Sequence, residues 1–154
     1  MATEIKTAEE KKKVGVGVGV LILRDGKVLL GKRHTNPAKA TSRLNGAGTW
    51  TMPGGKLEFG ELLIDCAKRE TQEETGMRID AADVLCINED IVETAHFITI
   101  GLIATKFAGE PQVMEPDKIT EWHWFDLDNL PIPMYFPSEK IIKNYSQKKF
   151  FIPQ

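Results

Sequence analysis

The sequence predicts an α+β fold arranged as an α/β/α sandwich, because strand and helix patterns are mixed along the chain without regular alternation. A strict alternation of valines with glycines begins at Val14, and such alternation is typical of a β-strand. Helical spacing runs from Phe59 to Thr75, and Gly76 then supplies a C-terminal cap. No internal repeat is visible in the sequence, so we expect a flexible leader over residues 1–13 and a single domain over residues 14–154.

Composition and charge exclude several classes of protein. The chain has 154 residues, of which 42% are hydrophobic and 27% are charged, as is typical of one soluble globular domain. Its 20 basic and 22 acidic residues give a formal net charge of -2, so no general positive field would attract a nucleic acid polymer or a membrane. The apolar run from Val14 to Leu23 is too short to span a bilayer. Two cysteines are too few for a disulfide framework, and we expect a cytoplasmic protein.

Turn residues and periodicity predict the other elements. Asp25 and Gly26 indicate a hairpin between the first strand and a second strand over Val28–Arg33. Residues 34–49 lack periodicity and predict a long loop that either borders the active site or is disordered. The bare glycine face of the first strand indicates close approach of a helix or a ligand. The remaining predicted elements are strands over 50–52, 84–92, 96–107 and 121–125, and a helix over 138–145.

One face of the predicted central helix is apolar at its start and acidic at its end. Leu63 and Ala67 are followed at helical spacing by Glu70 and Glu74, and Glu73 adds a third acid to the last two turns. Like charges at this spacing repel, and the negative end of the helix dipole adds to the cost. A divalent cation would offset this repulsion, and oxygen ligands select Mg²⁺, Mn²⁺ or Ca²⁺ over Zn²⁺. The alternative is a solvated acidic face neutralised by the basic residues Lys68, Arg69 and Arg78.

Residues 55–77 resemble the Nudix box, which has the pattern GX5EX7REUXEEXGU. They match every glycine and charged position of that pattern, and the one departure is Thr71, which stands where the family usually has an aliphatic residue. A looser resemblance extends from Val14 to Tyr145, because the strand, LLGKR, TMPGG and the box follow one another in the family's order. The resemblance implies a Nudix fold with a mixed central sheet. It also implies an enzyme that cleaves phosphoanhydride bonds in nucleotide-like substrates with Mg²⁺, or alternatively with Mn²⁺.

The resemblance further implies roles for individual residues. The metal ligands would be Gly54, Glu70, Glu73, Glu74 and Glu121. Glu61 would pair with Arg69 to orient the helix, and Glu70 or Glu73 would act as the base that activates water. Glu121 has the place of a carboxylate that precedes a tryptophan in MutT-like members, and an exposed strand acid is the alternative interpretation. The catalytic set is therefore Glu61, Arg69, Glu70 and Glu73.

Three residues outside the box are candidates for contacting substrate. Arg33 at the end of a strand would meet a phosphate, or is a plain surface residue. The segments Met114–Lys118 and Met134–Pro137 are similar to segments of eukaryotic MutT homologues, in which the aromatic pair of the second segment borders the base pocket. Tyr135 or Phe136 would then stack on a base, with aromatic core packing as the alternative.

Hydrolysis of nucleoside triphosphates, including oxidised or modified ones, to monophosphate and pyrophosphate is the function that we expect first. ADP-ribose and dinucleoside polyphosphates are alternative substrates, because loops around the box set the substrate. Residues 87–97 lack the proline that ADP-ribose-specific members often carry there. A non-catalytic nucleotide sensor is a third hypothesis, although its usual sign is a damaged box. Resemblance to related MutT-type proteins also implies a homodimer.

Overall fold

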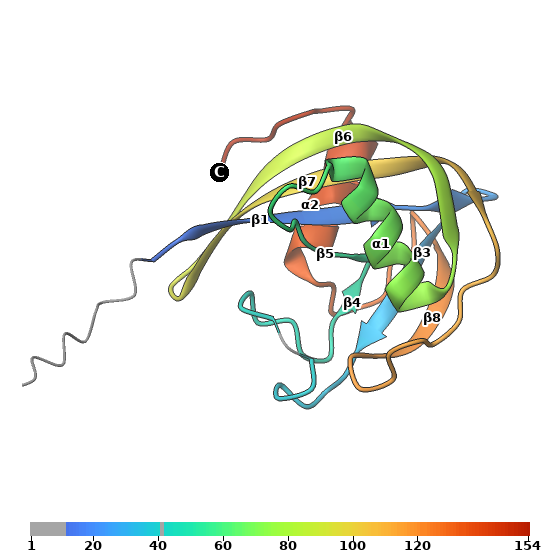
Figure 1. Ribbon diagram of the computed structural model, residues 1–154, viewed down its shortest axis with the longest axis horizontal. Coiled ribbons are helices and arrows are strands. Elements are labelled where there is room, and N and C mark those ends of the chain that lie inside the picture. Colours follow the sequence, from blue (N-terminus) through green and yellow to red (C-terminus); the bar gives the residue numbers. More distant parts are fainter. Residues whose placement is uncertain (1–11, 41) are drawn as a thin grey trace, which may run out of the picture.

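The computed structural model describes residues 12–40 and 42–154, so the predicted leader falls almost wholly outside the described residues. The described part of the chain holds two helices and two four-stranded sheets (Figure 1). The first sheet has the order β5 (Gly54–Lys56), β1 (Val14–Leu21), β7 (Ala95–Ala108) and β6 (Arg78–Val92). Strand β1 runs parallel to β7 and antiparallel to β5, and β6 runs antiparallel to β7. The central sheet is therefore mixed, as predicted.

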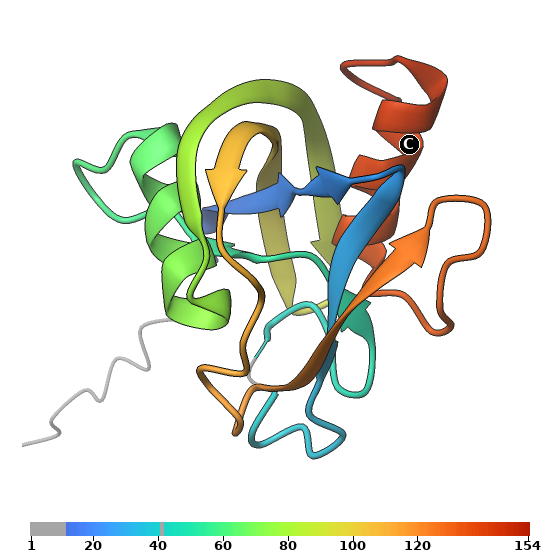
Figure 2. The same cartoon turned by 90° about the vertical axis from the view of Figure 1, so that its right-hand side faces the viewer.

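The second sheet is built on β3 (Lys27–Arg33), which lies beside the first sheet (Figure 2). Its other strands are β2 (Leu23–Arg24), β4 (Trp50–Thr51) and β8 (Ile119–Asp126), all antiparallel to β3. The predicted turn at Asp25 and Gly26 is confirmed, because β2 pairs with β3 there. Strand β1, however, does not continue into this hairpin and belongs to the first sheet.

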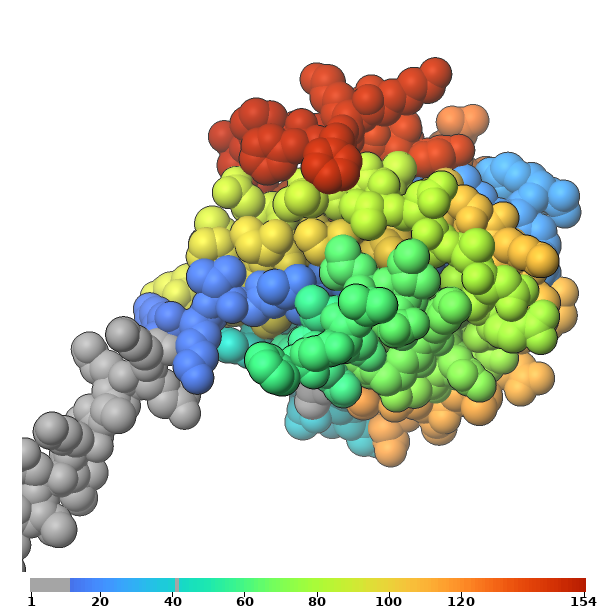
Figure 3. Space-filling model, turned by 45° about the horizontal axis from the view of Figure 1, so that its top comes forward, coloured from blue at the N-terminus to red at the C-terminus, as the bar shows by residue number. Residues whose placement is uncertain are grey.

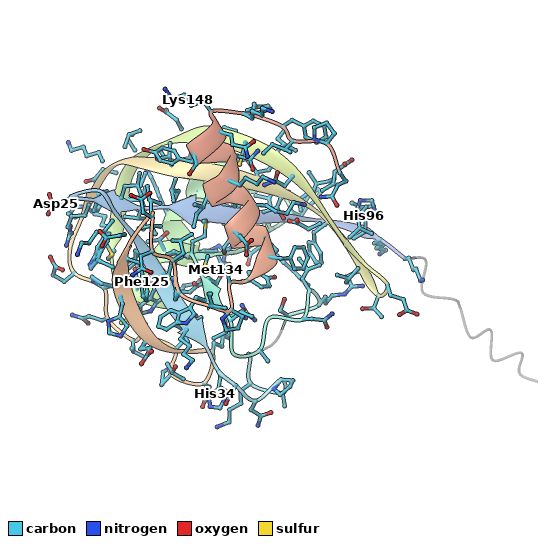
Figure 4. All side chains as sticks on the ribbon, turned by 180° about the vertical axis from the view of Figure 1, so that it is seen from behind. Asp25, His34, His96, Phe125, Met134 and Lys148 are labelled. Carbon is cyan, nitrogen blue, oxygen red and sulfur yellow. The ribbon has the colours of Figure 1, made fainter. Side chains whose placement is uncertain are left out.

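Two helices cover opposite faces of the first sheet. Helix α1 (Leu63–Thr75) lies in front of the sheet in Figure 1, and α2 (Phe136–Gln147) lies behind it. The view from behind in Figure 4 shows α2 crossing in front of β1. The C-terminal segment then lies against β6, where the Ile87 amide donates to the Phe150 carbonyl at 3.0 Å (Figure 3). This arrangement confirms the predicted α/β/α sandwich. None of the described helices is long and apolar enough to cross a membrane.

Strand β1 supplies side chains to both layers. Val20, on the α1 side, is fully buried with Cys66 and Ala67 of that helix. Leu21, on the α2 side, is fully buried with Ile141. Each such buried side chain contributes about 1.5–3 kcal/mol relative to an exposed one. The alternation in β1 therefore holds both helices to one sheet.

The glycines of β1 are explained by what approaches them. A Cβ atom on Gly15 would lie 2.5 Å from the Phe97 ring, and one on Gly19 would lie 2.6 Å from Ile141 of α2. These contacts confirm that a helix packs closely on the bare face. Gly17 differs, because its nearest neighbour would be 3.7 Å away. The space in front of Gly17 belongs to the cavity described below.

Helix α1 begins four residues later than predicted, at Leu63 instead of Phe59. Gly60 has a φ of 79°, in the left-handed region that an α-helix excludes. The C-terminal end is as predicted, because Gly76 has a φ of 73° and its amide donates to the Gln72 carbonyl at 2.9 Å. Strand β6 also begins earlier than predicted, at Arg78 instead of Val84. Register shifts between β6 and β7 interrupt the alternation that would have revealed these first residues.

Replacing Gly31 of β3 by alanine should destabilise the fold. The new methyl group would lie 2.7 Å from Ile119 and 2.8 Å from the rigid Trp122 ring. Overpacking of this kind costs about 1–3 kcal/mol, which urea unfolding would measure. Gly17→Ala is the matched control, because its methyl group meets nothing closer than 3.7 Å. Equal stability of the two variants would contradict this account of the interface between β3 and β8.

Candidate active site

A cavity of about 710 Å³ opens between the two sheets and is the candidate active site. It is bordered by β1, β5, the C-terminal half of α1, the start of α2 and the loop over residues 34–49. That loop therefore borders the site, as one of the two interpretations predicted. The charged residues of the lining are Arg33, Arg43, Lys56, Glu70, Glu73, Glu74, Glu115 and Lys118. The cavity thus brings acidic and basic side chains together.

Gly54, just before the box, and Gly55, its first residue, allow an unusually close approach. A Cβ atom on Gly54 would lie 2.0 Å from the Val18 carbonyl oxygen of β1. One on Gly55 would lie 2.4 Å from the carboxylate of Glu70. Only glycine fits at Gly54, because the Val18 backbone occupies the space that a side chain would need, and a side chain at Gly55 would displace the Glu70 carboxylate. Strand β5 is therefore pressed between β1 and the acidic face of α1.

Arg69 connects the loop before α1 to the acids of the helix. Its Nε donates to Glu61 Oε2 at 2.7 Å and its Nη2 donates to Glu61 Oε1 at 3.0 Å, so this pair is bidentate. Its Nη1 donates to Glu70 Oε1 at 2.8 Å and approaches Glu73 Oε2 at 3.4 Å. The Lys56 carbonyl accepts a further bond at 3.2 Å. One guanidinium therefore fixes the position of three carboxylates.

Glu61 lies in the loop before α1 and not in its first turn, which corrects the predicted location. The ion pair that the resemblance implied between Glu61 and Arg69 is present. Arg69 lowers the pKa of Glu61 to about 2, mainly through its hydrogen bonds to the carboxylate. Glu61 therefore stays ionised at neutral pH and holds the guanidinium in place.

The acids that face the cavity carry negative charge that the protein only partly balances. Burial raises the pKa of Glu70, and the hydrogen bond from Arg69 opposes this shift. Burial also raises the pKa of Glu74 well above its usual range, and the neighbouring Glu70 and Glu115 add to the rise. The last turn of α1 contains no basic residue. These carboxylates therefore lie where an added cation would be stabilised.

The donor set fits a hard divalent metal ion. Glu70, Glu73 and Glu74 present carboxylate oxygens to the cavity wall, and the backbone of Gly54 lies beside Glu74. Oxygen donors of this kind suit Mg²⁺ or Mn²⁺ better than zinc. Among residues 12–40 and 42–154, no three or more His, Cys, Asp or Glu side chains are arranged so that they could hold a metal ion by themselves. An open site with few protein ligands is what Mg²⁺ commonly uses when substrate phosphates complete its shell.

The opposite wall of the cavity carries Arg33 and Tyr135. The guanidinium of Arg33 lies 5.0 Å from the centre of the Tyr135 ring, and its Nη2 donates to the Ala40 carbonyl at 3.1 Å. The Tyr135 hydroxyl lies 2.9 Å from Ser42 Oγ. Burial raises the pKa of Tyr135, so its hydroxyl remains protonated at neutral pH. Arg33 and Tyr135 therefore form a polar wall in which both side chains are held.

Most of the predicted site residues come together, and two do not. Arg33, Gly54, Glu70, Glu73, Glu74 and Tyr135 all line the cavity, and Arg69 and Glu61 support it from α1 and its preceding loop. Phe136 does not line it and instead packs against the buried cluster around Leu44 and Phe97. Glu121 does not line it either and lies 4.0 Å from His123. Figure 4 shows His34 and His96 far apart, at different edges of the molecule.

The pairing of Glu121 with Lys32, next to a β-bulge in β8, explains its position. Lys32 pairs with Glu121 but Arg33 pairs with Ile119, so β8 has one extra residue at this point. Lys32 and Arg33 point to opposite faces of β3, and their partners do the same. Ile119 therefore faces the cavity with Arg33, whereas Glu121 faces away with Lys32. The sequence shows no sign of this bulge.

Sequence reasoning missed several lining residues. Glu115 was noted only within a segment, yet it lines the cavity and contributes to the raised pKa of Glu74. Lys56 at the end of β5 and Arg43 in the loop before β4 approach the Phe97 ring, at 5.7 Å and 5.9 Å from its centre. The position of Lys56 directly after Gly55 was a usable signal for a phosphate contact. Arg43 and Glu115 lie in segments without periodicity, which gave no signal.

The NUDIX domain family model matches residues 13–145. The chain belongs to the Nudix family. It is a Nudix hydrolase, an enzyme of the class that cleaves phosphoanhydride bonds in nucleotides. Glu70, Glu73 and Glu74 of its Nudix box line the cavity.

Relatives and solved structures agree with the Nudix fold. The ADP-ribose pyrophosphatase of Methanocaldococcus jannaschii is 36% identical over 136 residues, which cover 87% of this chain and 74% of the relative. The oxidized purine nucleoside triphosphate hydrolase of Mus musculus is 31% identical, over 78% of this chain and 71% of the relative. The crystal structure of a MutT NUDIX hydrolase from Burkholderia pseudomallei has a TM-score of 0.76 and 34% identity, and covers 86% of this chain and 98% of its own.

Removing the charge of Glu61 should cause a loss of stability that depends on pH. The folded pKa of Glu61, about 2, lies below its ordinary value of 4.5, so folding favours the ionised carboxylate. The stability from this pair is therefore complete above pH 4.5 and is lost as the pH falls toward 2. In urea unfolding, Glu61→Gln should be less stable than the native protein at neutral pH, and the difference should shrink across that interval.

Glu58→Gln is the matched control for Glu61→Gln. Glu58 lies 3.8 Å from the same guanidinium but its side chain is 68% exposed, against 13% for Glu61. Solvent screens an exposed pair, so this variant should keep nearly the native stability at every pH. A Glu61→Gln effect that was independent of pH would contradict the assignment.

Proposed function

We propose that this Nudix hydrolase cleaves nucleoside triphosphates, including oxidised or modified ones, to a monophosphate and pyrophosphate with Mg²⁺. The observation that carries the proposal is the charge pattern of one cavity, in which four acids lie near four basic side chains. The acids suit a divalent cation and the basic residues suit phosphate oxygens. The Tyr135 ring in the cavity wall offers an aromatic side chain on which a base could stack.

Each residue has a defined task in this proposal. Glu70, Glu73 and Glu74 would hold the metal, which when bound supplies positive charge for the phosphoryl oxygens and the attacking water. Arg69 donates to Glu70 Oε1 at 2.8 Å, and a side-chain hydrogen bond links Glu70 to Glu74, so the two carboxyl groups lie close enough to share a metal ion. A carboxylate oxygen of Glu70 or Glu73 accepts the proton of the attacking water. Arg33, Arg43, Lys56 and Lys118 would contact the phosphates.

The names of the relatives support this substrate class and point to one alternative substrate. The mouse and zebrafish proteins, 31% and 32% identical, are both named oxidized purine nucleoside triphosphate hydrolases. The similar structure from Burkholderia pseudomallei is named a MutT NUDIX hydrolase. The 36% identical relative, named an ADP-ribose pyrophosphatase, makes ADP-ribose the second candidate substrate. Both substrates carry a phosphoanhydride next to a nucleoside, so the acid cluster serves either one.

Two further inferences concern the setting of the enzyme. Cys66 and Cys86 are both buried and free, and burial raises the pKa of the two thiols to about 12 and about 11. Inert thiols without disulfides are typical of proteins of reducing compartments, so we infer a cytoplasmic enzyme. The homodimer stays a prediction from the resemblance.

A panel of substrates tests the proposed function. Canonical and oxidised nucleoside triphosphates, ADP-ribose and dinucleoside polyphosphates would be incubated with Mg²⁺ or with EDTA, and the products separated by chromatography. We expect Mg²⁺-dependent release of monophosphate and pyrophosphate from triphosphates. Glu73→Gln should lower kcat by roughly 10²-fold or more without unfolding the protein, whereas Asp65→Asn in the first turn of α1 should not. Hydrolysis of ADP-ribose alone would contradict the proposal.

The matched variants Glu115→Gln and Glu121→Gln test which downstream acid serves the site. Glu115 lines the cavity and lies close enough to Glu74 to raise its pKa, whereas Glu121 faces away. Glu115→Gln should lower kcat/KM by about 10-fold or more, and Glu121→Gln should leave it unchanged. A loss of activity in Glu121→Gln but not in Glu115→Gln would instead support the sequence prediction that Glu121 is a metal ligand.

A further inference from the structure

A charged network lies buried behind the cavity wall and has no part in the phosphate chemistry. Asp90 of β6 is completely buried. Its Oδ1 accepts a bond from Lys140 Nζ of α2 at 2.8 Å, and its Oδ2 accepts one from the Thr99 hydroxyl of β7. Lys140 also donates to the Glu89 carbonyl. Burying a charged pair in this way costs free energy of desolvation. A role in ligand specificity would account for that cost.

The network fixes the direction of the hydrogen bond that Thr99 makes. The Lys140 ammonium can only donate, and its pairing with Asp90 holds that group as a carboxylate, which can only accept. Thr99 must therefore donate its single hydroxyl proton to Asp90. The Thr99 oxygen keeps only its lone pairs for other partners. A free hydroxyl could either donate or accept, whereas this one can only accept.

The fixed acceptor belongs to the cavity. Thr99 is 7% exposed and lines the cavity together with Tyr135 and Ser138. Gly17 lies beside it in the neighbouring strand, and a Cβ atom there would be 3.7 Å from Thr99 Oγ1. The absence of a side chain at Gly17 keeps the hydroxyl oxygen accessible. Asp90 also acts electrostatically on Tyr135, which places the network at the end of the cavity where Tyr135 lies.

We infer that Thr99 is a specificity-determining residue that accepts a hydrogen bond from the exocyclic amino group of the nucleobase, and that Asp90 and Lys140 are positioning residues that fix its polarity. The inference rests on the proposed function for the class of ligand. It selects bases with an exocyclic amino group over analogues that lack it or carry a carbonyl oxygen in its place. An oxygen facing Thr99 Oγ1 would leave both groups unpaired in a buried site.

Equilibrium binding tests this without turnover. Titration calorimetry would compare paired monophosphates that differ at one amino group, GMP with IMP and CMP with UMP. In at least one pair, the native protein should bind the amino-bearing member about tenfold more tightly, as one hydrogen bond predicts. Thr99→Val keeps the shape and removes the acceptor, so the ratio should fall to about one, and Thr99→Ser should retain it.

Asp90→Asn makes the sharper prediction. Lys140 offers only donors, so the amide oxygen of the variant must face it and the amide N–H₂ must face Thr99. Thr99 would then accept from residue 90 and donate into the cavity. The preference should reverse, and the carbonyl-bearing member, UMP in its pair, should bind more tightly. If this variant fails to fold, Gly17→Ala still tests the site, because its methyl group should weaken binding of the amino-bearing member without loss of stability.

The outcomes separate the two proposals. Failure of the native protein to hydrolyse triphosphates would overturn the proposed function, whatever the binding ratios. A native protein that distinguishes neither pair, or a Thr99→Val variant that keeps the full native ratio, would overturn the role of Thr99. A normal ratio in Asp90→Asn would show that Asp90 and Lys140 do not set the polarity.

Discussion

The guanidinium of Arg69 is the interaction on which the acidic site depends. It ties the loop after β5 to α1 by pairing with Glu61 through two hydrogen bonds and with Glu70 through one. Glu61 supplies the charge that holds Arg69 in place, and its low pKa keeps that charge in the neutral range. Glu70, Glu74 and Glu115 lie on the side that faces the cavity, where Glu70 and Glu115 raise the pKa of the buried Glu74. The protein thus concentrates carboxyl groups where a metal ion can offset their mutual repulsion.

Close backbone contacts give this charge a fixed position. Gly54 lies so near the Val18 carbonyl, and Gly55 so near the Glu70 carboxylate, that β5 has no freedom to shift between β1 and α1. On the other side of β1, Gly19 admits Ile141 of α2. The strand is therefore clamped by both helices, and Gly17, the one position of this face left open, becomes part of the cavity wall. Rigid support of this kind is what a site needs if its acids are to keep their geometry.

The local sequence pattern was enough to predict most helices and strands. The positions of several site residues depend on long-range contacts, so the sequence could not predict them. The stripe from Leu63 to Glu74 and the cap at Gly76 depend on neighbours within the helix, so they could be predicted correctly. Glu121 lies outside the site because it pairs with Lys32, on the face of β3 that is turned away from the cavity. The network at Asp90 was invisible for a similar reason, because Lys140 lies 50 residues away in the sequence and no periodicity links the two.

The two ends of the cavity are suited to different parts of a nucleotide. The acid cluster and its basic neighbours act on phosphate groups that every nucleotide substrate shares, so they provide chemistry but no choice of base. The proposed discrimination between bases lies at the end formed by Tyr135, Ser138 and Thr99, where Arg33 lies over the Tyr135 ring and Asp90 holds the Thr99 hydroxyl. Tyr135 is tied to the loop over residues 34–49 through Ser42, and Thr99 is tied to α2 through Asp90. Changes in that loop or in α2 can therefore alter the substrate while α1 and its acids stay the same, which is how one catalytic box can serve many nucleotides.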